Sequence, residues 1–244
     1  TCTNVSTTDS DGDTVTNIFN WYNNGTSIMN LYMPFDSNNN TTTLDYSSRQ
    51  NTGTVTGAVW YPLGKTGGTY YFDGADDRIE VAYNASLDLG DSSFGFAFWM
   101  NHTSVNANDA VISKADGNPV QEGKTGWRVW TRKNGKGIVF HMADGTNNES
   151  KNIIDSNCSD DTWHHVALVY DNDNDILYGY YDGALDKVQT AAFNYGLGNN
   201  TMGAPDGSNV LRIGLNSFNL LSDYAGHIDD VRIYTRNVTA EQVL

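Results

Sequence analysis

The sequence predicts an all-β protein built as a sandwich or barrel, and three observations lead to that prediction. Short runs of alternating apolar and polar residues recur along the chain, with turn residues between them and no amphipathic stretch of about ten residues. The acidic residues comprise 25 Asp and only 4 Glu, accompanied by 29 Asn and 24 Gly. Asp, Asn and Gly favour turns, whereas Glu favours helices. Aromatic residues make up 12% of the chain, enough for one large core.

The expected strands follow one another from residue 15 to residue 234. In residues 94–100 the large side chains at alternate positions share one face, which we expect to lie in the core. Residues 163–170 and 176–181 flank a polar turn and predict a long hairpin. The single predicted helix lies at Thr239–Gln242, which has the pattern of a capping box. The runs that predict strands are 15–22, 28–35, 57–61, 69–72, 78–81, 93–100, 110–114, 126–132, 137–142, 163–170, 175–181, 210–215 and 226–234.

Charge and hydropathy exclude two classes of partner. The chain of 244 residues has 14 basic and 29 acidic side chains, a net charge of −15. Its few basic residues are scattered, which excludes nucleic acid because phosphate contacts need a basic stripe. The longest apolar run, residues 94–100, is too short for membrane insertion, which needs about 20 residues. The first residues do not resemble a signal peptide, so we expect a mature product or a segment of a longer protein.

Sequons and cysteines predict an extracellular or cell-surface protein. Asn-x-Ser/Thr occurs about twice as often as this composition would produce by chance, although an Asn- and Thr-rich chain also forms sequons by accident. Cys2 and Cys158 are compatible with one disulfide in an oxidising compartment. Because Cys2 lies so near the first residue, pairing with another chain stays an alternative. The sequons begin at Asn4, Asn24, Asn39, Asn40, Asn84, Asn101, Asn148, Asn157, Asn199 and Asn237.

The first 29 residues differ from the remainder. An acidic turn at 9–13, a strand at 15–22 and a second turn at 23–26 supply too few strands to bury a core on their own. This piece resembles the closing half of an immunoglobulin-like or PKD-like surface domain. We therefore expect a partial immunoglobulin-like leader at residues 1–29 and one larger domain at residues 30–244.

From about Leu31 onward a second resemblance covers nearly the whole chain. The sequence is similar to LamG-like, concanavalin A-like jelly-roll domains, and its matching segments follow the order of that family. The resemblance implies two antiparallel sheets packed face to face, with both ends of the jelly roll meeting in one sheet. The segments are 33–36, 45–48, 51–55, 71–79, 96–100, 111–114, 163–167, 181–183 and 228–234.

Catalytic carboxylates are not expected. Laminarinase-type glycosidases with this fold carry Glu-x-Asp-x-x-Glu on one strand, because a retaining mechanism needs two carboxyl groups about 5–5.5 Å apart. None of the four Glu residues has a second Glu within five positions. On the strand pattern, one of His164 and His165 faces inward and the other outward, which favours a structural or surface role. The sequence therefore predicts a protein that is not an enzyme.

Calcium is the favoured cofactor, because this cation takes oxygen ligands from Asp, Asn and main-chain carbonyl groups. The alternative is that the carboxylates only cap turns. The resemblance implies a structural metal held by Asp73, Asp76 and Asp229 and, less directly, by Asp45. Analogy with pentraxin and laminin-type relatives implies a second, ligand-binding calcium at the rim, bordered by Asp116, Asn118, Asn216 and Asp223.

Aromatic side chains are the candidates for sugar binding, since their rings stack on pyranose faces. Trp127 and Trp130 lie three residues apart on one expected strand and point to opposite faces, so at most one of them lies in the core. Trp60 and Tyr61 form a second candidate platform. A sandwich core also needs buried Trp, so each of these residues has a structural alternative.

Two functions are compatible with these observations. The first is a non-catalytic recognition or adhesion module that binds carbohydrate or an extracellular protein and is stabilised by calcium. The second is a structural repeat of an extracellular filament or surface layer, in which strands of a neighbouring copy complete the leader. The missing catalytic pair and the acidic composition favour the first function, whereas the incomplete leader favours the second.

Overall fold

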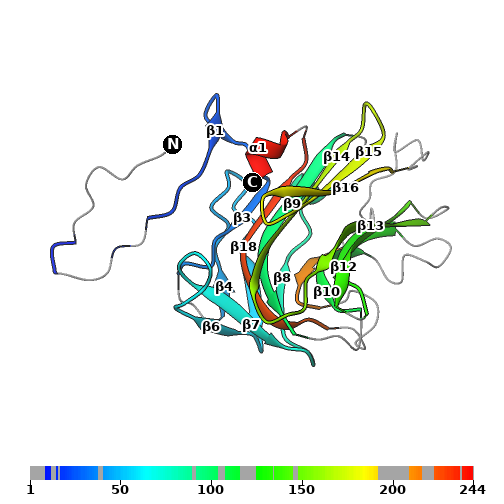
Figure 1. Ribbon diagram of the computed structural model, residues 1–244. Coiled ribbons are helices and arrows are strands. Elements are labelled where there is room, and N and C mark those ends of the chain that lie inside the picture. Colours follow the sequence, from blue (N-terminus) through cyan, green and yellow to red (C-terminus); the bar gives the residue numbers. More distant parts are fainter. Residues whose placement is uncertain are drawn as a thin grey trace.

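Two antiparallel sheets packed face to face form the protein, which confirms the predicted sandwich (Figure 1). The computed structural model describes residues 9–11, 15, 17–37, 41–89, 92–103, 108–115, 125–133, 135–144, 148–191, 209–215, 223–236 and 238–243. Within these residues, each sheet has eight strands.

The first sheet, here named the helix-side sheet, contains β3 and β18, which are the first and the last described strands of the jelly roll. Its order is β16-β15-β14-β9-β18-β7-β6, and β3 pairs with β18 beyond this path. The two ends of the jelly roll therefore meet in one sheet, as expected. Its strands are β3 (Leu31–Met33), β6 (Val59–Tyr61), β7 (Thr69–Asp73), β9 (Phe94–His102), β14 (Trp163–Asp171), β15 (Ile176–Tyr181), β16 (Ala184–Thr190) and β18 (Ala225–Tyr234).

The second sheet, here named the opposite sheet, has the order β13-β12-β11-β10-β17-β8-β5-β4. A single turn of 3-10 helix, η1 (Ala85–Leu87), follows β8. The strands of this sheet are β4 (Thr42–Thr43), β5 (Gly53–Thr56), β8 (Arg78–Val81), β10 (Ala110–Ala115), β11 (Thr125–Thr131), β12 (Lys136–Asp144), β13 (Asn148–Asn157) and β17 (Leu211–Ile213).

The core lies between the sheets. The alternating large residues of β9 point into it, as predicted, and Phe94, Phe96, Phe98 and Met100 are all at most 1% exposed. Phe96 packs against Trp127 of β11, with ring centroids 4.6 Å apart. This contact joins the middle of one sheet to the middle of the other.

A second apolar cluster covers part of the outer face of the helix-side sheet. Helix α1 (Ala240–Val243) packs there through Val243, beside Tyr234 and Val238, and Ile28 and Met29 pack in from the leader. Half of the predicted capping box forms, because Gln242 Oε1 accepts a hydrogen bond from the Thr239 N–H at 3.0 Å, while the Gln242 N–H donates to the Thr239 main-chain carbonyl. The cover reaches Ala97 of β9 and Ala167 of β14 and leaves the other end of the face open.

The leader differs from the prediction. The sequence predicts a strand at residues 15–22, but in the described part of this range and its surroundings only a short hairpin of β1 (Tyr22–Asn23) and β2 (Thr26–Ser27) forms. Figure 1 shows residues 9–11 away from both sheets, whereas Ile18 packs against the second apolar cluster and Asn20 Nδ2 donates to the Tyr46 carbonyl at 2.6 Å. No described strand pairs with these residues. The domain boundary after residue 29 and pairing of the leader with a neighbouring copy stay predictions. Across the described ranges, no helix has the length and hydropathy to cross a bilayer.

Gly179 allows the two sheets to approach each other at β15 and β13. A Cβ atom at residue 179 would lie 1.7 Å from the main-chain oxygen of Ile153. We expect Gly179→Ala to lower the free energy of unfolding by about 3 kcal/mol, the upper end of the range for overpacking. Gly183→Ala is the control, since its Cβ would meet nothing within 4 Å and costs only about 1 kcal/mol through its positive φ. Urea denaturation measures both, and equal losses would contradict the close approach.

Candidate functional site

The open end of the outer face carries a row of side chains that crosses four strands. Tyr71 of β7 pairs with His227 of β18, His227 pairs with Asn101 of β9, and Asn101 pairs with Trp163 of β14. Neighbouring strands lie about 4.8 Å apart, so directly paired side chains on one face are in contact range. The His227 ring lies 5.1 Å from Tyr71 and 5.9 Å from Trp163, centroid to centroid.

A second row runs beside the first, nearer to α1. Asp229 of β18 pairs with Trp99 of β9, and Trp99 pairs with His165 of β14. The Trp99 and His165 rings are 5.0 Å apart. Asp182, in the turn after β15, accepts a hydrogen bond from the His165 N–H at 2.9 Å. Lys65 places its Nζ 4.6 Å from the centre of the Trp99 ring, a cation–π contact.

These rows border a shallow cavity of about 440 Å³, here named the outer groove, which is lined by Lys65, Trp99, Trp163, His165, Asp182 and Gly183. Both Trp residues are half-buried, so their rings are held by the sheet and still present surface to a ligand. Lys65 and Asp182 are exposed and supply one cation and one carboxylate at the rim. Apolar ring surface with a few polar groups is typical of sites for small polar ligands.

His165 is neutral at pH 7. Burial and, to a smaller extent, the positive charge of Arg232 lower its pKa to about 4, against the opposing effect of Asp182. Burial also lowers the pKa of His227. The imidazole that lines the groove, that of His165, is therefore without positive charge, which suits an uncharged ligand better than an anion.

Asp229 holds the loop that carries Lys65. Its Oδ2 accepts hydrogen bonds from the main-chain N–H groups of Lys65 at 2.8 Å and Thr66 at 2.9 Å. The loop lies so close that a Cβ on Gly64 would be 2.8 Å from the same oxygen. Burial raises the pKa of Asp229 to about 7. Its Oδ1 is buried and has no hydrogen-bond partner among the described residues.

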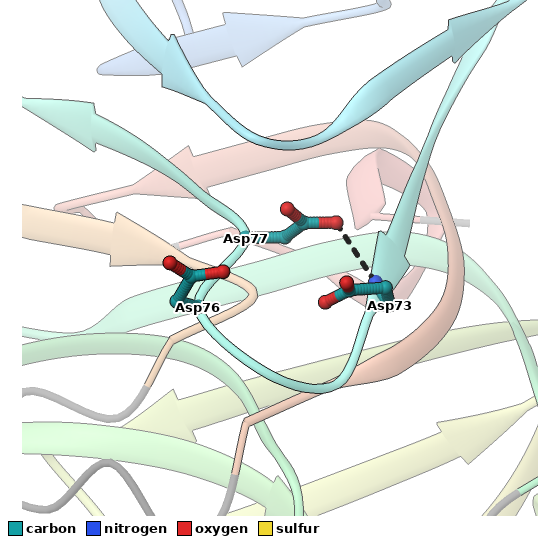
Figure 2. Close-up of side chains that lie close together, drawn as sticks. All are labelled: Asp73, Asp76 and Asp77. Atoms are coloured by element: carbon teal, nitrogen blue, oxygen red, sulfur yellow. Dashed lines mark hydrogen bonds between the residues drawn. The ribbon is translucent and has the colours of Figure 1, made fainter.

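Three carboxylates gather in the β7–β8 loop (Figure 2). One oxygen each of Asp73, Asp76 and Asp77 lies within 4.8 Å of the others. The loop is shaped by two of them, since Asp77 Oδ2 accepts from the Asp73 N–H and Asp73 Oδ1 accepts from the Ala75 N–H, both at 2.9 Å. Burial raises the pKa of Asp77, and the neighbouring negative charges of Asp73 and Asp76 add to the shift. Sequence reasoning named Asp73 and Asp76 as ligands and passed over Asp77.

The predicted four-residue metal centre is not assembled in one place, which is a correction. Asp229 lies four residues along β18 from Ala225, the partner of Asp73, a distance of about 13 Å along the strand. Asp45 is buried elsewhere and accepts main-chain hydrogen bonds from Tyr32, Ser47 and Asn51. Both carboxylates stabilise backbone turns, because buried carboxylates need such donors.

The predicted tryptophan pair divides between core and surface. Trp127 is fully buried against Phe96, so its assignment as a binding residue is wrong. Trp130 points to the other face, where the Arg128 guanidinium lies 4.3 Å from its ring. Trp60 turns inward and donates to the Phe35 carbonyl, whereas Tyr61 faces outward beside His227.

The predicted rim calcium falls mostly outside the described residues. Asp116, Asn118 and Asn216 lie outside them, and Asp223 is 5% exposed, next to Ala110. The rim calcium thus stays a prediction.

The predicted glycosylation sites and cysteines also lie partly inside and partly outside the described residues. Among the sequons, Asn24, Asn84, Asn148 and Asn157 are exposed, and Asn101 is half-buried in the first row. Asn4, Asn39, Asn40, Asn199 and Asn237 lie outside the described residues, as does Cys2. Cys158 is buried and forms no disulfide within the described part of the chain, and burial raises the pKa of its thiol to about 12. Glycosylation and the disulfide therefore stay predictions.

A buried Ser-His-Asp chain links β9 to two loops. His102 Nδ1 lies 2.6 Å from Ser159 Oγ, and His102 Nε2 lies 2.8 Å from Asp109 Oδ2. The His102 ring is fully buried and stacks on Tyr224 at 5.0 Å. A ring enclosed in this way is tied into the packing, so we assign it a structural role.

Comparison with known families matches residues 72–244 to a family described as the concanavalin A-like lectin/glucanases superfamily. The chain belongs to that family. The match covers most of the sandwich and begins within β7.

Two curated relatives are proteins of Clostridium botulinum. The non-toxic nonhemagglutinin of type E is 26% identical over 180 residues, which are 70% of this chain and 15% of that protein. The type A protein of strain Kyoto is 28% identical over 115 residues, 47% of this chain and 9% of that protein. The chain thus spans only a small part of these curated relatives.

Two solved structures share the fold. The binding domain of Paraclostridial Mosquitocidal Protein 1 has a TM-score of 0.64 and 18% identity, covering 88% of this chain and 50% of that one. Domain 4 of an extracellular arabinanase from Geobacillus stearothermophilus, solved with arabinotriose, has a TM-score of 0.62 and 17% identity. It covers 88% of this chain and 96% of that domain.

The buried neutral His165 predicts a pH effect on stability. The unfolded chain takes up a proton at this residue near pH 6.5, whereas the folded chain does so only near pH 4. Stability is therefore lost as pH falls from about 6.5 to 4, by at most about 3 kcal/mol. We expect His165→Gln to remove this loss. Urea denaturation of the unchanged chain and of His165→Gln, each at pH 7 and pH 4.5, measures how much stability each protein loses. Asp229 is present in both proteins, so its titration contributes equally to the two losses. Parallel losses in the two proteins would contradict the buried neutral histidine.

Proposed function

We propose that this chain is a non-catalytic carbohydrate-binding module of an extracellular protein and that it binds glycans in the outer groove. The observation that carries the proposal is the pair of side-chain rows, in which Trp99 and Trp163 are held by the sheet at its uncovered end. Aromatic rings stack on the apolar faces of sugars, while Lys65 and Asp182 can bond to hydroxyl groups.

The comparisons support a binding function at a coarser level. The arabinanase domain is matched over nearly its whole length, and its structure holds arabinotriose. The mosquitocidal protein is matched over half of a binding domain. At this level of identity the likeness supports the fold, so the ligand assigned to this chain rests on the groove and not on these names.

Replacing the groove tryptophans tests the proposal. We expect Trp99→Ala and Trp163→Ala each to weaken glycan binding about tenfold or more, equal to about 1.4 kcal/mol, because the stacking surface is lost. A glycan array that includes arabino-oligosaccharides identifies the ligand, and calorimetry gives the affinities.

The matched control is Trp130→Ala, which removes a half-buried tryptophan from the opposite sheet and leaves binding unchanged. If Trp130→Ala abolished binding while the groove variants retained it, the site would lie on the opposite sheet. An array without any bound glycan would remove the carbohydrate function and leave a protein partner.

We also propose that calcium binds the loop cluster of Asp73, Asp76 and Asp77. Their close oxygens fit a hard divalent cation, and Asp76 has an exposed carboxylate in the same loop. An ion there would stabilise the β7–β8 turn and leave the outer groove unchanged.

Thermal denaturation with calcium or with a chelator tests this proposal. Calcium at about one hundred times its dissociation constant would raise the melting temperature by about 5 °C or more. Asp76→Asn should lose this increase and Asp229→Asn should keep it. The reverse pattern would place the ion at Asp229, and equal melting temperatures with and without calcium would refute binding.

A further inference from the structure

A second cavity lies where the leader meets helix α1. Figure 1 shows the β1–β2 hairpin beside α1 at the covered end of the helix-side sheet. The Ile28 N–H donates to the Trp21 carbonyl at 2.9 Å, which closes the hairpin, and the burial of Ile28 in the second apolar cluster fixes the hairpin to the domain. Helix α1 is fixed by Tyr234, whose hydroxyl donates to the Gln242 carbonyl at 3.1 Å.

The cavity between these elements, here named the junction pocket, encloses about 560 Å³. This volume is within the range of about 300–1,000 Å³ that small-molecule sites have. It is separate from the outer groove, since the two cavities share no lining residue. Both of its walls are anchored, so the space is a built feature of the fold.

Among the charged residues of the pocket, Arg236 favours binding of an anion. Arg232 is already paired with Asp230, with Nη2 2.5 Å from Oδ2. Arg236 also lines the pocket, is half-buried, and makes no hydrogen bond or ion pair with any described residue. In a chain with 29 acidic and 14 basic residues, a half-buried guanidinium without a carboxylate partner is unexpected. Such a group binds a carboxylate in a bidentate manner.

The remaining lining residues favour a sugar ring. Trp21 and Tyr22 are 53% and 57% exposed, so their rings offer stacking surface. Asn23 and Gln242 contribute side-chain amides, and the Nε2 group of Gln242 stays a donor while its Oε1 caps the helix. Glu241 is the carboxylate of the pocket and accepts hydrogen bonds from hydroxyl groups.

We propose that the junction pocket binds a sugar acid, with the ligand carboxylate on Arg236 and the ring against Trp21 or Tyr22. The guanidinium recognises the acid, the indole or phenol recognises the ring, and the amides and Glu241 bond to the hydroxyl groups. This site and the glycan site of the outer groove are independent, because different residues form them.

Titration of the full chain with glucuronate, followed by NMR, tests the proposal. Glucose, which lacks the carboxylate, and acetate, which lacks the sugar ring, are the comparison ligands. We expect glucuronate to bind at least fivefold more tightly than either probe. Arg236→Ala and Trp21→Ala should each weaken glucuronate binding about tenfold. Arg236→Lys should restore only part of it, because a lysine cannot form the bidentate contact.

The controls separate this site from the other features of the protein. Arg132→Ala removes an exposed arginine elsewhere and should leave glucuronate binding unchanged, as should Trp163→Ala. Equal binding of acetate would show an adventitious anion contact only, and undiminished binding by Arg236→Ala would refute the site. Loss in Trp163→Ala alone would move the sugar acid to the outer groove. Melting temperatures near that of the unchanged chain show that Trp21→Ala still folds.

Discussion

The second apolar cluster covers only part of the outer face of the helix-side sheet, and the surface of this protein depends on that constraint. One face of that sheet is covered by the opposite sheet. In the described residues, the other face is covered over part of its area by α1, Val238, the end of the leader and the loop that Asp229 holds. Beyond Ala97 and Ala167 the outward positions must therefore contact water and still pack on their neighbours. Trp, Tyr and His meet both demands, because each has an apolar body and a polar edge. The outer groove lies at the uncovered end and the junction pocket at the covered end.

Most of the core strands could be predicted from sequence, because each has a buried face that imposes an alternating pattern. Of the four edge strands in the described residues, β4, β13 and β16 could not, whereas β6 falls in the predicted run 57–61. Residues 148–157 and 184–190 form β13 and β16, yet both are largely polar, since an edge strand exposes much of its surface. The opposite error occurred in the leader, where the strand-forming residues 17–21 have no neighbouring strand among the described residues. Strand propensity is expressed only when a partner completes the hydrogen bonds.

The candidate site was predictable only where it is local. Asp73 and Asp76 belong to one turn, so sequence alone brings them together, whereas the expected contribution of Asp229 depended on a strand register that the sequence does not specify. The outer groove was missed because it combines residues from β9, β14 and two loops. The outward position of one residue in the pair His164 and His165 was the available signal, and His165 does face outward beside Trp99.

The pairing of β3 with β18 affects how this domain folds. Tyr32 and Arg232 are neighbours across these strands although roughly 200 residues separate them in the chain. A sheet that needs its last long strand between β9 and β7 stays open on the ribosome until that strand has left the exit tunnel. Closing so long a loop is entropically costly and slow, so the unfinished sandwich exposes strand edges throughout synthesis. Nascent chains of this protein are accordingly most vulnerable to aggregation just before β18 leaves the tunnel.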